Sequence, residues 1–568
     1  MRQIKRTQIF LFFLSLIVSV RLFNLQILEG HKFRYLSRAN CIRIVPFVGP
    51  RGRILDRDKR ILVDNLPTYE VAVFPQDISK IDGFLSQVSS ILDIPSDKLK
   101  GNFNKISNSS LPLVLLNNLD KKTAIVIEEL KFKFPQLIIN MVPKRYYPYG
   151  NLASHLIGYL SLIDYWRLTK WQDYGYSIKD TVGYGGVEER YDYYLKSQSG
   201  GLQVEVDNRN RIVRILGYRT PKAGKDIQLT IDLKLQKIVE EALEGYQGAV
   251  VILDPHTGEV LAMASSPSFS PADFLEEKNL NFYFSASSSP LINRAISGLY
   301  PAGSIFKLIL SYIGLEKANI GKNKTFFCEG VMKLGNEEFL CWDKHGSQNI
   351  FEAIVHSCNI FFYRLGLILG ADLIHNYALK FGLGKPTGID LPEEKAGFVP
   401  SPLLKRVKKF ESWFAGDTAN FSIGQGDLLV TPLGICRMIS IFANGGKLIR
   451  PYIVKAIDGK DISKYQRKII PLNLETIHME LINNAMRKVV EDPEGTAHFL
   501  YMPKIPIAGK TGTAQVAKKL SHAWFSGYFP ADNPRYSICV ILEHAGPSLY
   551  ACKVTRYIIE RMLEEGLL

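Results

Sequence analysis

The sequence is poor in cysteine, in long apolar runs and in clusters of basic residues. Seven cysteines in 568 residues exclude a small scaffold held by many disulfides, and an odd number cannot all pair within the chain. Only one run is apolar enough to cross a bilayer, which excludes a polytopic transporter. The net charge of +15 is spread along the chain without a basic arm. We therefore expect attraction to an anionic membrane surface or polymer, and no nucleic-acid partner.

What the chain does have is an ordinary globular composition over a great length. Hydrophobic residues make up 46% of the sequence and charged residues 22%. This balance is typical of folded domains and not of disorder. A chain of 568 residues is too long for one compact domain, so we expect two or three domains, each with a sizeable core.

The single long apolar run covers residues 8–28 and reads QIFLFFLSLIVSVRLFNLQIL. As a helix it reaches about 30 Å, the thickness of a bilayer core. No convincing small-residue cleavage site follows, so we expect an uncleaved signal anchor with residues 1–7 as a cytoplasmic tail. A removed signal peptide and a buried core helix are the alternatives. Basic residues on the two sides of the run nearly balance, so charge does not fix its orientation.

The character of the sequence changes near residue 230. Residues 29–229 mix short strand-like runs with polar turns, which predicts an extended α+β pedestal domain. From residue 230 a helical segment is followed by two β-rich runs joined by the turn Asp254–Gly258, and a strand pair is expected late in the chain. We therefore expect a multidomain α+β protein whose second domain covers residues 230–568.

Ser304 and Lys307 lie in the sequence YPAGSIFKLIL, where Pro301 and Gly303 precede an apolar helical run. This pattern predicts a serine at a helix N-terminus with the lysine on the same face. A serine hydroxyl needs a base to become a nucleophile, and a lysine kept neutral by burial or cationic neighbours can accept its proton. The spacing alone is weak evidence, because an exposed serine near a solvated lysine arises often by chance.

Two more short motifs follow in order. Ser357 and Asn359, in the sequence HSCN, interrupt an apolar helical stretch and would be costly there without hydrogen bonds, so they suit a proton relay and a substrate contact. The third motif is a strand-like run that contains Lys510, Thr511, Gly512 and Thr513. Its lysine and hydroxyls suit a carboxylate, and we expect the glycine to let a ligand backbone approach. The ordered set of three motifs is far more specific than any one of them.

This ordered set resembles the penicillin-recognising serine acyltransferases, a group that includes penicillin-binding proteins and β-lactamases. Other blocks agree with the resemblance. PRGRILDRDKRIL is similar to the N-proximal signature of class B penicillin-binding proteins, LTIDLKLQ and VILDPHTGEVLAMAS to the entry of their transpeptidase domain, and GQGDLLVTPL to the block before its Lys-Thr-Gly strand. HAWFSGYFP resembles the elongation-type member, penicillin-binding protein 2. These blocks occur at intervals over nearly the whole chain.

The resemblance implies a peptidoglycan D,D-transpeptidase that serves cell elongation and rod shape. Its pedestal would be of the dimerisation type, and its transpeptidase domain would pack an antiparallel sheet between helices. Ser304 would attack the carbonyl between two terminal D-alanines, and Lys307 would accept its proton. Ser357 would relay a proton toward the leaving D-alanine, and Asn359 would hold Lys307 and the substrate amide. No cofactor would be needed for this acyl transfer.

The resemblance also assigns the binding of the substrate. The backbone amides of Ser304 and Thr513 would form the oxyanion hole. The terminal carboxylate would be bound by residues of the third motif, namely Lys510, Thr511 and Thr513, and Gly512 would also belong to the substrate-binding strand. A β-lactam antibiotic would mimic the D-alanyl-D-alanine and leave a long-lived acyl group on Ser304.

A location and partners follow from the same resemblance. Cross-linking takes place outside the bacterial cytoplasmic membrane, so a single-pass chain would keep its N-terminus in the cytoplasm and its bulk in the periplasm. The expected partners are peptidoglycan stem peptides, the membrane, a polytopic glycosyltransferase of the elongation machinery and a periplasmic activator.

Two other functions use the same residues. A D,D-carboxypeptidase or a β-lactamase would resolve the acyl-enzyme with water, but no glutamate motif can be assigned to activate that water. A non-catalytic β-lactam sensor or scaffold would use Ser304 only for signalling. A sensor is expected to carry several membrane spans and a cytoplasmic effector, whereas one span with a short tail is predicted here.

A group of soft metal ligands lies between the first two motifs and consists of Cys328, Cys341, His345 and Cys358. Three thiolates and one imidazole could close a tetrahedral zinc site, although the spacing differs from that of standard zinc fingers. Such a site resembles one found in some members of the penicillin-binding protein 2 family, where the Zn²⁺ would be structural. A disulfide between Cys328 and Cys341 and simple buried thiols are the alternatives.

Overall fold

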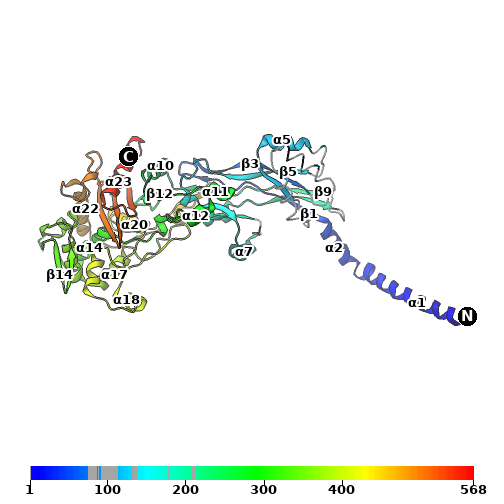
Figure 1. Cartoon of the computed structure of the whole chain (residues 1–568), viewed down its shortest axis with the longest axis horizontal. Helices are drawn as coiled ribbons and strands as arrows, with labels where there is room; N and C mark the ends of the chain where they lie inside the picture. Colours follow the sequence, from blue (N-terminus) through cyan, green and yellow to red (C-terminus); the bar gives the residue numbers. More distant parts are fainter. Residues whose placement is uncertain are drawn as a thin grey trace. The chain divides into compact units, whose positions relative to one another are not determined.

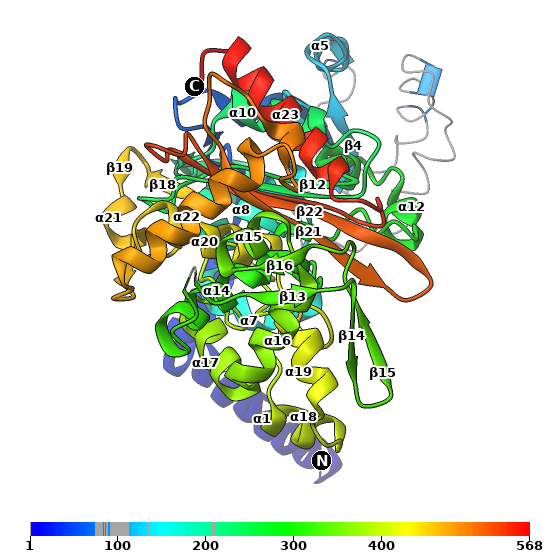
Figure 2. The ribbon, with the colours of Figure 1, turned by 90° about the vertical axis from the view of Figure 1, so that its left-hand side faces the viewer.

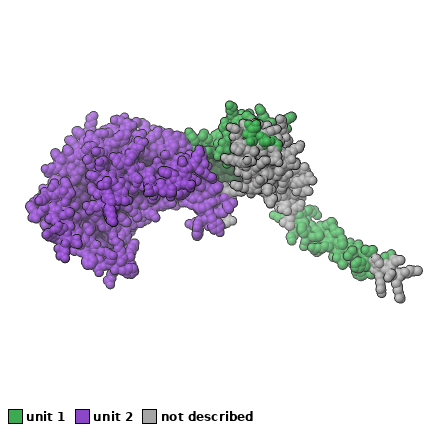
Figure 3. Space-filling model, viewed as in Figure 1, with its two compact units in different colours: residues 1–52, 65–146, 196–225 green, residues 53–64, 147–195, 226–568 purple. Residues whose placement is uncertain are grey.

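The computed structural model describes, apart from a few single positions between them, residues 2–73, 113–130, 137–176, 180–206, 212–321 and 323–568. The chain divides into two compact units (Figure 3). Unit 1 comprises residues 1–52, 65–146 and 196–225, and unit 2 comprises residues 53–64, 147–195 and 226–568. Neither unit is one continuous stretch of sequence, because the chain passes between them several times. The domain limits at residues 29, 229 and 230 stay a prediction.

The chain begins with an apolar helix. Helix α1 (Arg2–Phe23) and the π-helical turn η1 (Asn24–Leu28) together contain the predicted anchor. Among the described residues, Gln8–Leu28 is the one helical stretch that is long and apolar enough to cross a membrane, with a mean hydropathy of 2.0 and no burial in its most apolar window. The described part of the chain therefore contains one candidate membrane span, in the run that the sequence indicates.

The rest of unit 1 is built mainly from strands. An antiparallel sheet has the order β1 (Ile42–Phe47), β8 (Gly200–Val206) and β9 (Ile212–Arg219). The unit also contains the helices α2 (Gly30–Cys41) and α5 (Lys121–Leu130). Its other strands are the C-terminal part of β3 (Ile61–Val73), β4 (Leu113–Leu119) and β5 (Leu137–Tyr146). Strand β3 pairs with both β4 and β5. The expected mixture of strands and helix in this part of the chain is confirmed.

Residues 147–195 form a small segment of unit 2. Its two strands, β6 (Tyr159–Leu162) and β7 (Thr181–Tyr184), pair with each other in an antiparallel manner. The rest of the segment consists of loops and short helices, namely α6 (Ser154–Ile157), α7 (Tyr165–Trp171), η3 (Gln172–Tyr174), α8 (Gly186–Arg190) and α9 (Asp192–Leu195). The segment is rich in aromatic side chains, several of which are exposed.

The centre of unit 2 is a five-stranded antiparallel sheet (Figures 1 and 2). Its order is β12 (Val260–Ser266), β11 (Gly248–Leu253), β23 (Tyr536–Leu542), β22 (Lys519–Phe529) and β21 (Ala508–Val516). The β11–β12 hairpin is the one that the sequence predicts around Asp254–Gly258. Because strands β11 and β23 are buried on both sides, their sequences are almost entirely apolar and do not alternate with polar residues.

Helices cover both faces of this sheet (Figure 2). Helices α10 (Leu233–Ala242) and α23 (Leu549–Glu564) contact each other and the strands on one face, and α20 (Pro432–Ala443) contacts β11, β22 and β23 on the other. Asp232 caps α10, since its carboxylate accepts the N–H of Lys234 at 2.9 Å. An antiparallel sheet packed between helices is therefore confirmed.

A helical lobe lies beside the edge strand β21. Its helices are α14 (Lys307–Lys317), α15 (Ile350–Val355), α16 (Asn359–Leu369), α17 (Ala371–Lys380), α19 (Ala415–Ser422) and α22 (Thr476–Glu491). Two small hairpins extend the lobe, β13 (Phe326–Cys328) with β16 (Gly346–Gln348) and β14 (Val331–Leu334) with β15 (Glu337–Leu340). All three sequence motifs lie where this lobe meets β21.

Candidate active site

Ser304 lies in a tight turn at the start of a buried helix. The turn is the 3-10 helix η4 (Gly303–Phe306), and α14 continues it from Lys307. Gly303 has a φ of 56° and Gly424 a φ of 74°, a region that favours glycine. The N–H of Gly303 donates to the carbonyl of Gly424 at 2.9 Å, which fixes the turn. The predicted helix N-terminus at Ser304 is confirmed, with a first turn that is 3-10 instead of α.

Lys307 is fully buried behind the serine turn. Its Nζ donates to Asn359 Oδ1 at 2.6 Å and to the Ser357 carbonyl at 2.8 Å, and it lies 3.3 Å from Ser357 Oγ. Burial lowers the pKa of Lys307 from 10.5 to about 8, although the nearby Cys358 and Cys341 act in the opposite direction. Because this pKa lies close to physiological pH, part of the Lys307 side chain is unprotonated there and can accept a proton.

The segment with Ser357 and Asn359 breaks the helical stretch completely. Helix α15 ends at Val355, Ser357 takes a left-handed conformation with a φ of 54°, and α16 begins at Asn359. Asn359 is fixed from its other side as well, because its Nδ2 donates to the carbonyl of Leu340 at 3.1 Å and its backbone N–H to Cys341 Sγ at 3.2 Å. The break thus directs both polar side chains toward Lys307.

The third motif lies on β21, the edge strand of the sheet. Lys510 is fully buried, and both burial and the charge of Lys307 hold its pKa well below the ordinary value. Thr511 and Thr513 line the groove next to Ser304, two positions apart on the strand. Thr511 Oγ1 donates to Thr496 Oγ1 at 2.7 Å, and the Thr513 carbonyl accepts from Gln425 Nε2 at 3.4 Å.

Gly512 has a different role from the one expected. A Cβ at this position would lie 3.2 Å from the Ala302 carbonyl, 3.2 Å from Trp524 Cβ and 3.3 Å from Ile305 Cγ1. These neighbours belong to the serine turn and the sheet, and none of them faces the groove. The missing side chain therefore lets the serine turn pack against β21, and it does not make room for a ligand backbone.

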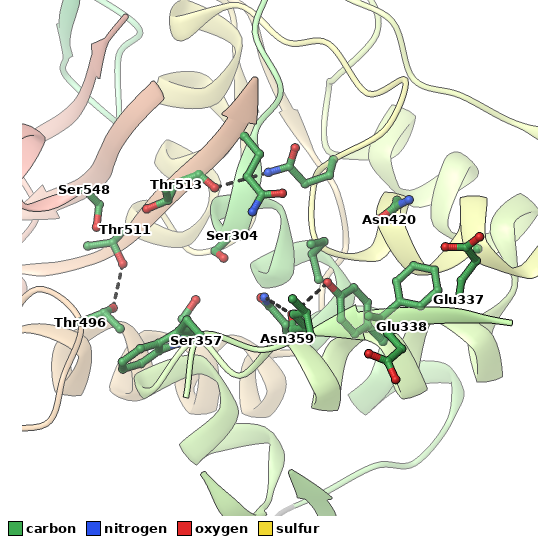
Figure 4. Close-up of a pocket in the computed structure, with 18 of the residues that line it drawn as sticks. Ser304, Glu337, Glu338, Ser357, Asn359, Asn420, Thr496, Thr511, Thr513 and Ser548 are labelled. Atoms are coloured by element: carbon green, nitrogen blue, oxygen red, sulfur yellow. Dashed lines mark hydrogen bonds between the residues drawn. The ribbon is translucent and has the colours of Figure 1, made fainter. Parts of the chain in front are cut away.

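The motifs share one groove of about 910 Å³. Figure 4 shows Thr511, Thr496 and Ser548 on one side of Ser304, and Glu337 and Glu338 on the other. Lys307 and Lys510 lie buried behind the side chains that line it. One end of the groove thus has hydroxyls near two lysines, and the opposite end has carboxylates.

Several residues of the groove carried no assignment from the sequence. They include Glu337, Glu338, Phe339, Leu340, Trp342, Tyr363, Phe414, Asn420, Gln425, Thr496 and Ser548. Gln425 belongs to the block GQGDLLVTPL, whose family resemblance could have pointed to it. The others lie in loops, hairpins and helices with no motif, and only the tertiary structure brings them to Ser304.

The four predicted metal ligands lie together between the two small hairpins and α16. The ligand atoms of Cys328, Cys341, His345 and Cys358 all lie within 4.8 Å of one another. His345 Nδ1 is 3.6 Å from Cys328 Sγ and 3.5 Å from Cys341 Sγ. Zinc–sulfur and zinc–nitrogen bonds of about 2.3 and 2.0 Å at tetrahedral angles require a separation of about 3.5 Å, so the donor set fits a zinc ion.

The cysteines of this cluster also contact His345 and Asn359. Cys328, Cys341 and Cys358 are free thiols in the structure. The pKa of Cys341 is held below its ordinary value by hydrogen bonding, first with Cys358 and also with His345 and the Asn359 N–H. A thiolate is the form that binds zinc, and the Sγ of Cys341 lies directly beside the backbone N–H of Asn359.

Comparisons with known proteins agree over almost the whole chain. Residues 248–564 match the family model of the penicillin-binding protein transpeptidase domain, and residues 46–229 match that of the penicillin-binding protein dimerisation domain. The peptidoglycan D,D-transpeptidase MrdA of Salmonella typhimurium is 33% identical over 582 residues, which covers 96% of this chain and 93% of that protein.

Solved structures give the same result. The complex between penicillin-binding protein 2 and MreC from Helicobacter pylori is similar with a TM-score of 0.82 and 27% identity, covering 93% of this chain and 99% of that one. A structure that describes the coordination of polymerization and crosslinking by a peptidoglycan synthase complex is similar with a TM-score of 0.72 and 29% identity, covering 98% of both chains.

Proposed function

The chain belongs to the elongation-type penicillin-binding proteins and is a peptidoglycan D,D-transpeptidase, and we propose that Ser304 supplies its nucleophile. One observation supports this assignment most strongly. The three motifs are far apart in sequence, yet all of them contribute to one groove, which is lined by Ser304, Ser357, Asn359, Thr511 and Thr513. A serine beside a buried lysine of lowered pKa is the arrangement that covalent acyl transfer requires.

Acylation begins at the carbonyl between the two terminal D-alanines. Ser304 Oγ forms the new bond to carbon while Lys307 Nζ accepts the hydroxyl proton. The turn at Ser304 and the adjacent strand at Thr513 offer backbone N–H groups to the developing oxyanion. The proton then passes through Ser357 to the nitrogen of the leaving D-alanine, because Ser357 Oγ lies 3.3 Å from Lys307 Nζ. The carbon–nitrogen bond breaks and an acyl-enzyme remains.

The two ends of the groove have different tasks in this scheme. The terminal carboxylate of the donor peptide binds at Thr511 and Thr513. Its negative charge favours the protonated form of the buried Lys510, whose pKa burial and Lys307 otherwise lower. The acceptor approaches from the opposite end, where Glu337 and Glu338 attract its ammonium group. Once deprotonated, the acceptor nitrogen bonds to the acyl carbon and gives a proton to Lys307. The bond from that carbon to Ser304 Oγ breaks, and Lys307 returns the proton to Ser304 Oγ. A β-lactam uses the donor end and leaves its acyl group on Ser304.

We also propose that Cys328, Cys341, His345 and Cys358 bind a structural Zn²⁺. The ion would hold the small hairpins against the start of α16 and take no part in the acyl transfer. The cluster would support the position of Lys307 through hydrogen bonds of the chain itself, because Cys341 Sγ accepts the N–H of Asn359 and Asn359 Oδ1 accepts from Lys307 Nζ. The fit of the Nδ1–Sγ distances to a tetrahedral site supports this proposal.

A membrane location and partners complete the proposal. The helix Gln8–Leu28 would anchor the chain in the cytoplasmic membrane, with the N-terminus inside and the catalytic unit in the periplasm, where peptidoglycan lies. A periplasmic activator like the MreC of the Helicobacter complex and a polytopic glycosyltransferase would be its partners. The similarity to those two assemblies supports both partners.

Acylation by a fluorescent penicillin tests the nucleophile. Wild-type protein should acquire stable label, Ser304→Ala should acquire none, and Lys307→Ala should be slower by at least about a hundredfold. Ser548→Ala is the matched control, because this serine lines the same groove without a role in the reaction. Label on Ser304→Ala at the wild-type rate would refute the assignment, and label lost within seconds would favour a β-lactamase.

A further inference from the structure

A second pocket of about 410 Å³ lies in the small segment formed by residues 147–195. Four aromatic side chains line it, Trp171, Tyr174, Tyr176 and Tyr193. The remaining wall consists of Glu189, Arg190, Asp192 and Pro392. None of these residues belongs to the groove around Ser304, and the acyl transfer uses none of them.

The floor of this aromatic pocket is fixed by hydrogen bonds. The hydroxyl of the buried Tyr176 donates to Asp192, and the second oxygen of Asp192 accepts the N–H of Gly183 at 2.9 Å. The ring of Trp171 packs against that of Tyr176 with centroids 5.3 Å apart and an interplanar angle of 45°. The pocket is therefore a preformed cavity and not a chance gap between loops.

Its rim, in contrast, presents aromatic rings to solvent. Tyr174 is 66% exposed and Tyr193 is 67% exposed, and their rings meet edge to face with centroids 6.5 Å apart. Large aromatic rings around a surface cavity are typical of a binding site, because a ligand that covers them removes apolar surface from water, which is favourable.

The charges of the pocket narrow the class of ligand. Glu189 accepts the N–H of Gly185 at 2.7 Å and pairs with Arg167 at 3.1 Å. Asp192 is likewise engaged with Tyr176 and Gly183, so neither carboxylate is available to a cationic ligand. The polar groups that face a ligand are the exposed Arg190 and the tyrosine hydroxyls, which suit neutral hydroxyl and amide groups.

A saccharide has this combination of surfaces. The faces of a pyranose ring carry C–H groups that pack on aromatic rings, and its edge carries hydroxyls that hydrogen-bond with phenol and guanidinium groups. The reaction of this enzyme supplies such a ligand, because stem peptides are attached to a glycan strand. We propose that this aromatic pocket binds the glycan strand of peptidoglycan, an inference that rests on the proposed function.

The purpose of such a site is to retain the polymer. A stem peptide fills only the groove at Ser304, whereas a second contact to its glycan strand makes each following encounter intramolecular. The pocket should therefore raise the affinity for polymeric substrate without changing the chemistry at Ser304. Small substrates and β-lactams carry no glycan, so their rates of reaction with Ser304 should not depend on this pocket.

Binding of peptide-free glycan strands to the full-length protein in detergent tests the proposal. We expect calorimetric binding by the wild type, and a loss of about tenfold in affinity for Trp171→Ala and for Tyr193→Ala. Trp166→Ala is the matched control, because Trp166 lies on the same helix α7, is 78% exposed and does not line the pocket. Equal loss in the control and in Trp171→Ala would overturn the proposal.

Penicillin acylation of the same samples separates this proposal from the proposed function. All variants should be acylated at the wild-type rate, which also shows that they are folded. If Trp171→Ala fails to fold, Tyr193→Phe takes its place in the test. This variant keeps the aromatic ring, so its affinity for glycan should fall by a few-fold at most. If the wild type is acylated but binds no glycan, only the proposal that the aromatic pocket binds glycan is overturned. If the wild type is not acylated, the assignment of Ser304 as the nucleophile is overturned.

Discussion

Two lysines, Lys307 and Lys510, are fully buried behind the catalytic groove, although a buried ammonium group is costly. Both have lowered pKa values, and the charge of Lys307 contributes to the lowering at Lys510. Two like charges in one low-dielectric region oppose each other, so the neutral form of one of them is favoured. Lys307, which donates hydrogen bonds to Ser357 and Asn359, is the lysine that we propose as the base.

The lowered pKa of Lys307 predicts the pH dependence of acylation. Only the neutral amine accepts the proton of Ser304, so the second-order rate constant for a β-lactam should rise about tenfold per pH unit below 8 and level off above it. Stopped-flow acylation between pH 5.5 and 9.5 measures this. Lys307→Arg, which stays protonated, should be slow at every pH. A wild-type rate that falls as the pH rises through 8 would contradict the role of Lys307.

Gly512 provides a test of packing beneath the nucleophile. A valine side chain there would press on the Ala302 carbonyl and on Ile305, which carry the serine turn. We expect Gly512→Val to lower the free energy of unfolding by about 1–3 kcal/mol and to slow acylation more than tenfold. Gly217→Ala is the control, because its Cβ would meet only one atom, at 3.8 Å. Wild-type acylation by Gly512→Val would show that the turn tolerates displacement.

At the scale of elements, the Cys/His cluster connects strand β13, the segment that follows β15 and the start of α16. We expect about one zinc per chain by elemental analysis, and Cys328→Ser should lose it and lower the melting temperature by about 5 °C or more. Acylation should slow because Asn359 loses part of its support. Cys539→Ala, a buried cysteine outside the cluster, should keep its zinc. Zinc-free wild-type protein of full stability would exclude a structural metal.

The β14–β15 hairpin contributes the two carboxylates at the acceptor end of the groove. The double substitution Glu337→Gln, Glu338→Gln removes their charge and keeps their size. We expect unchanged penicillin acylation but a several-fold lower yield of cross-linked product in a transpeptidation assay with an amine acceptor. Equal reductions of both activities would indicate a general disturbance of the groove instead of an acceptor site.

Local sequence patterns predicted elements better than they predicted contacts. The hairpin around Asp254–Gly258 and the serine at a helix start follow from turn residues and periodicity, which act over a few positions. The role of Gly512 did not follow, because its neighbours Ala302 and Trp524 are distant in sequence. Thr496 and Gln425 reach the groove for the same nonlocal reason.

At the scale of the whole molecule, the apolar N-terminal stretch should be separable from catalysis. Its most apolar window buries nothing within the protein. We expect the full chain to sediment with membranes, and a chain of residues 29–568 to stay in the aqueous fraction, while both are acylated by penicillin within about twofold of each other. Loss of acylation on removal of residues 1–28 would mean that this stretch supports the catalytic unit.

The repeated passage of the chain between the two units affects how it is made. Strand β2 (Ile54–Leu55) belongs to unit 2, and its parallel partner β10 (Ile227–Leu229) is synthesised much later. With the periplasmic location that we propose, β2 waits for its partner while the intervening residues cross the membrane, and closing so long a loop is slow. An exposed strand edge in that interval is open to aggregation, so this protein should depend on periplasmic chaperones more than its final stability suggests.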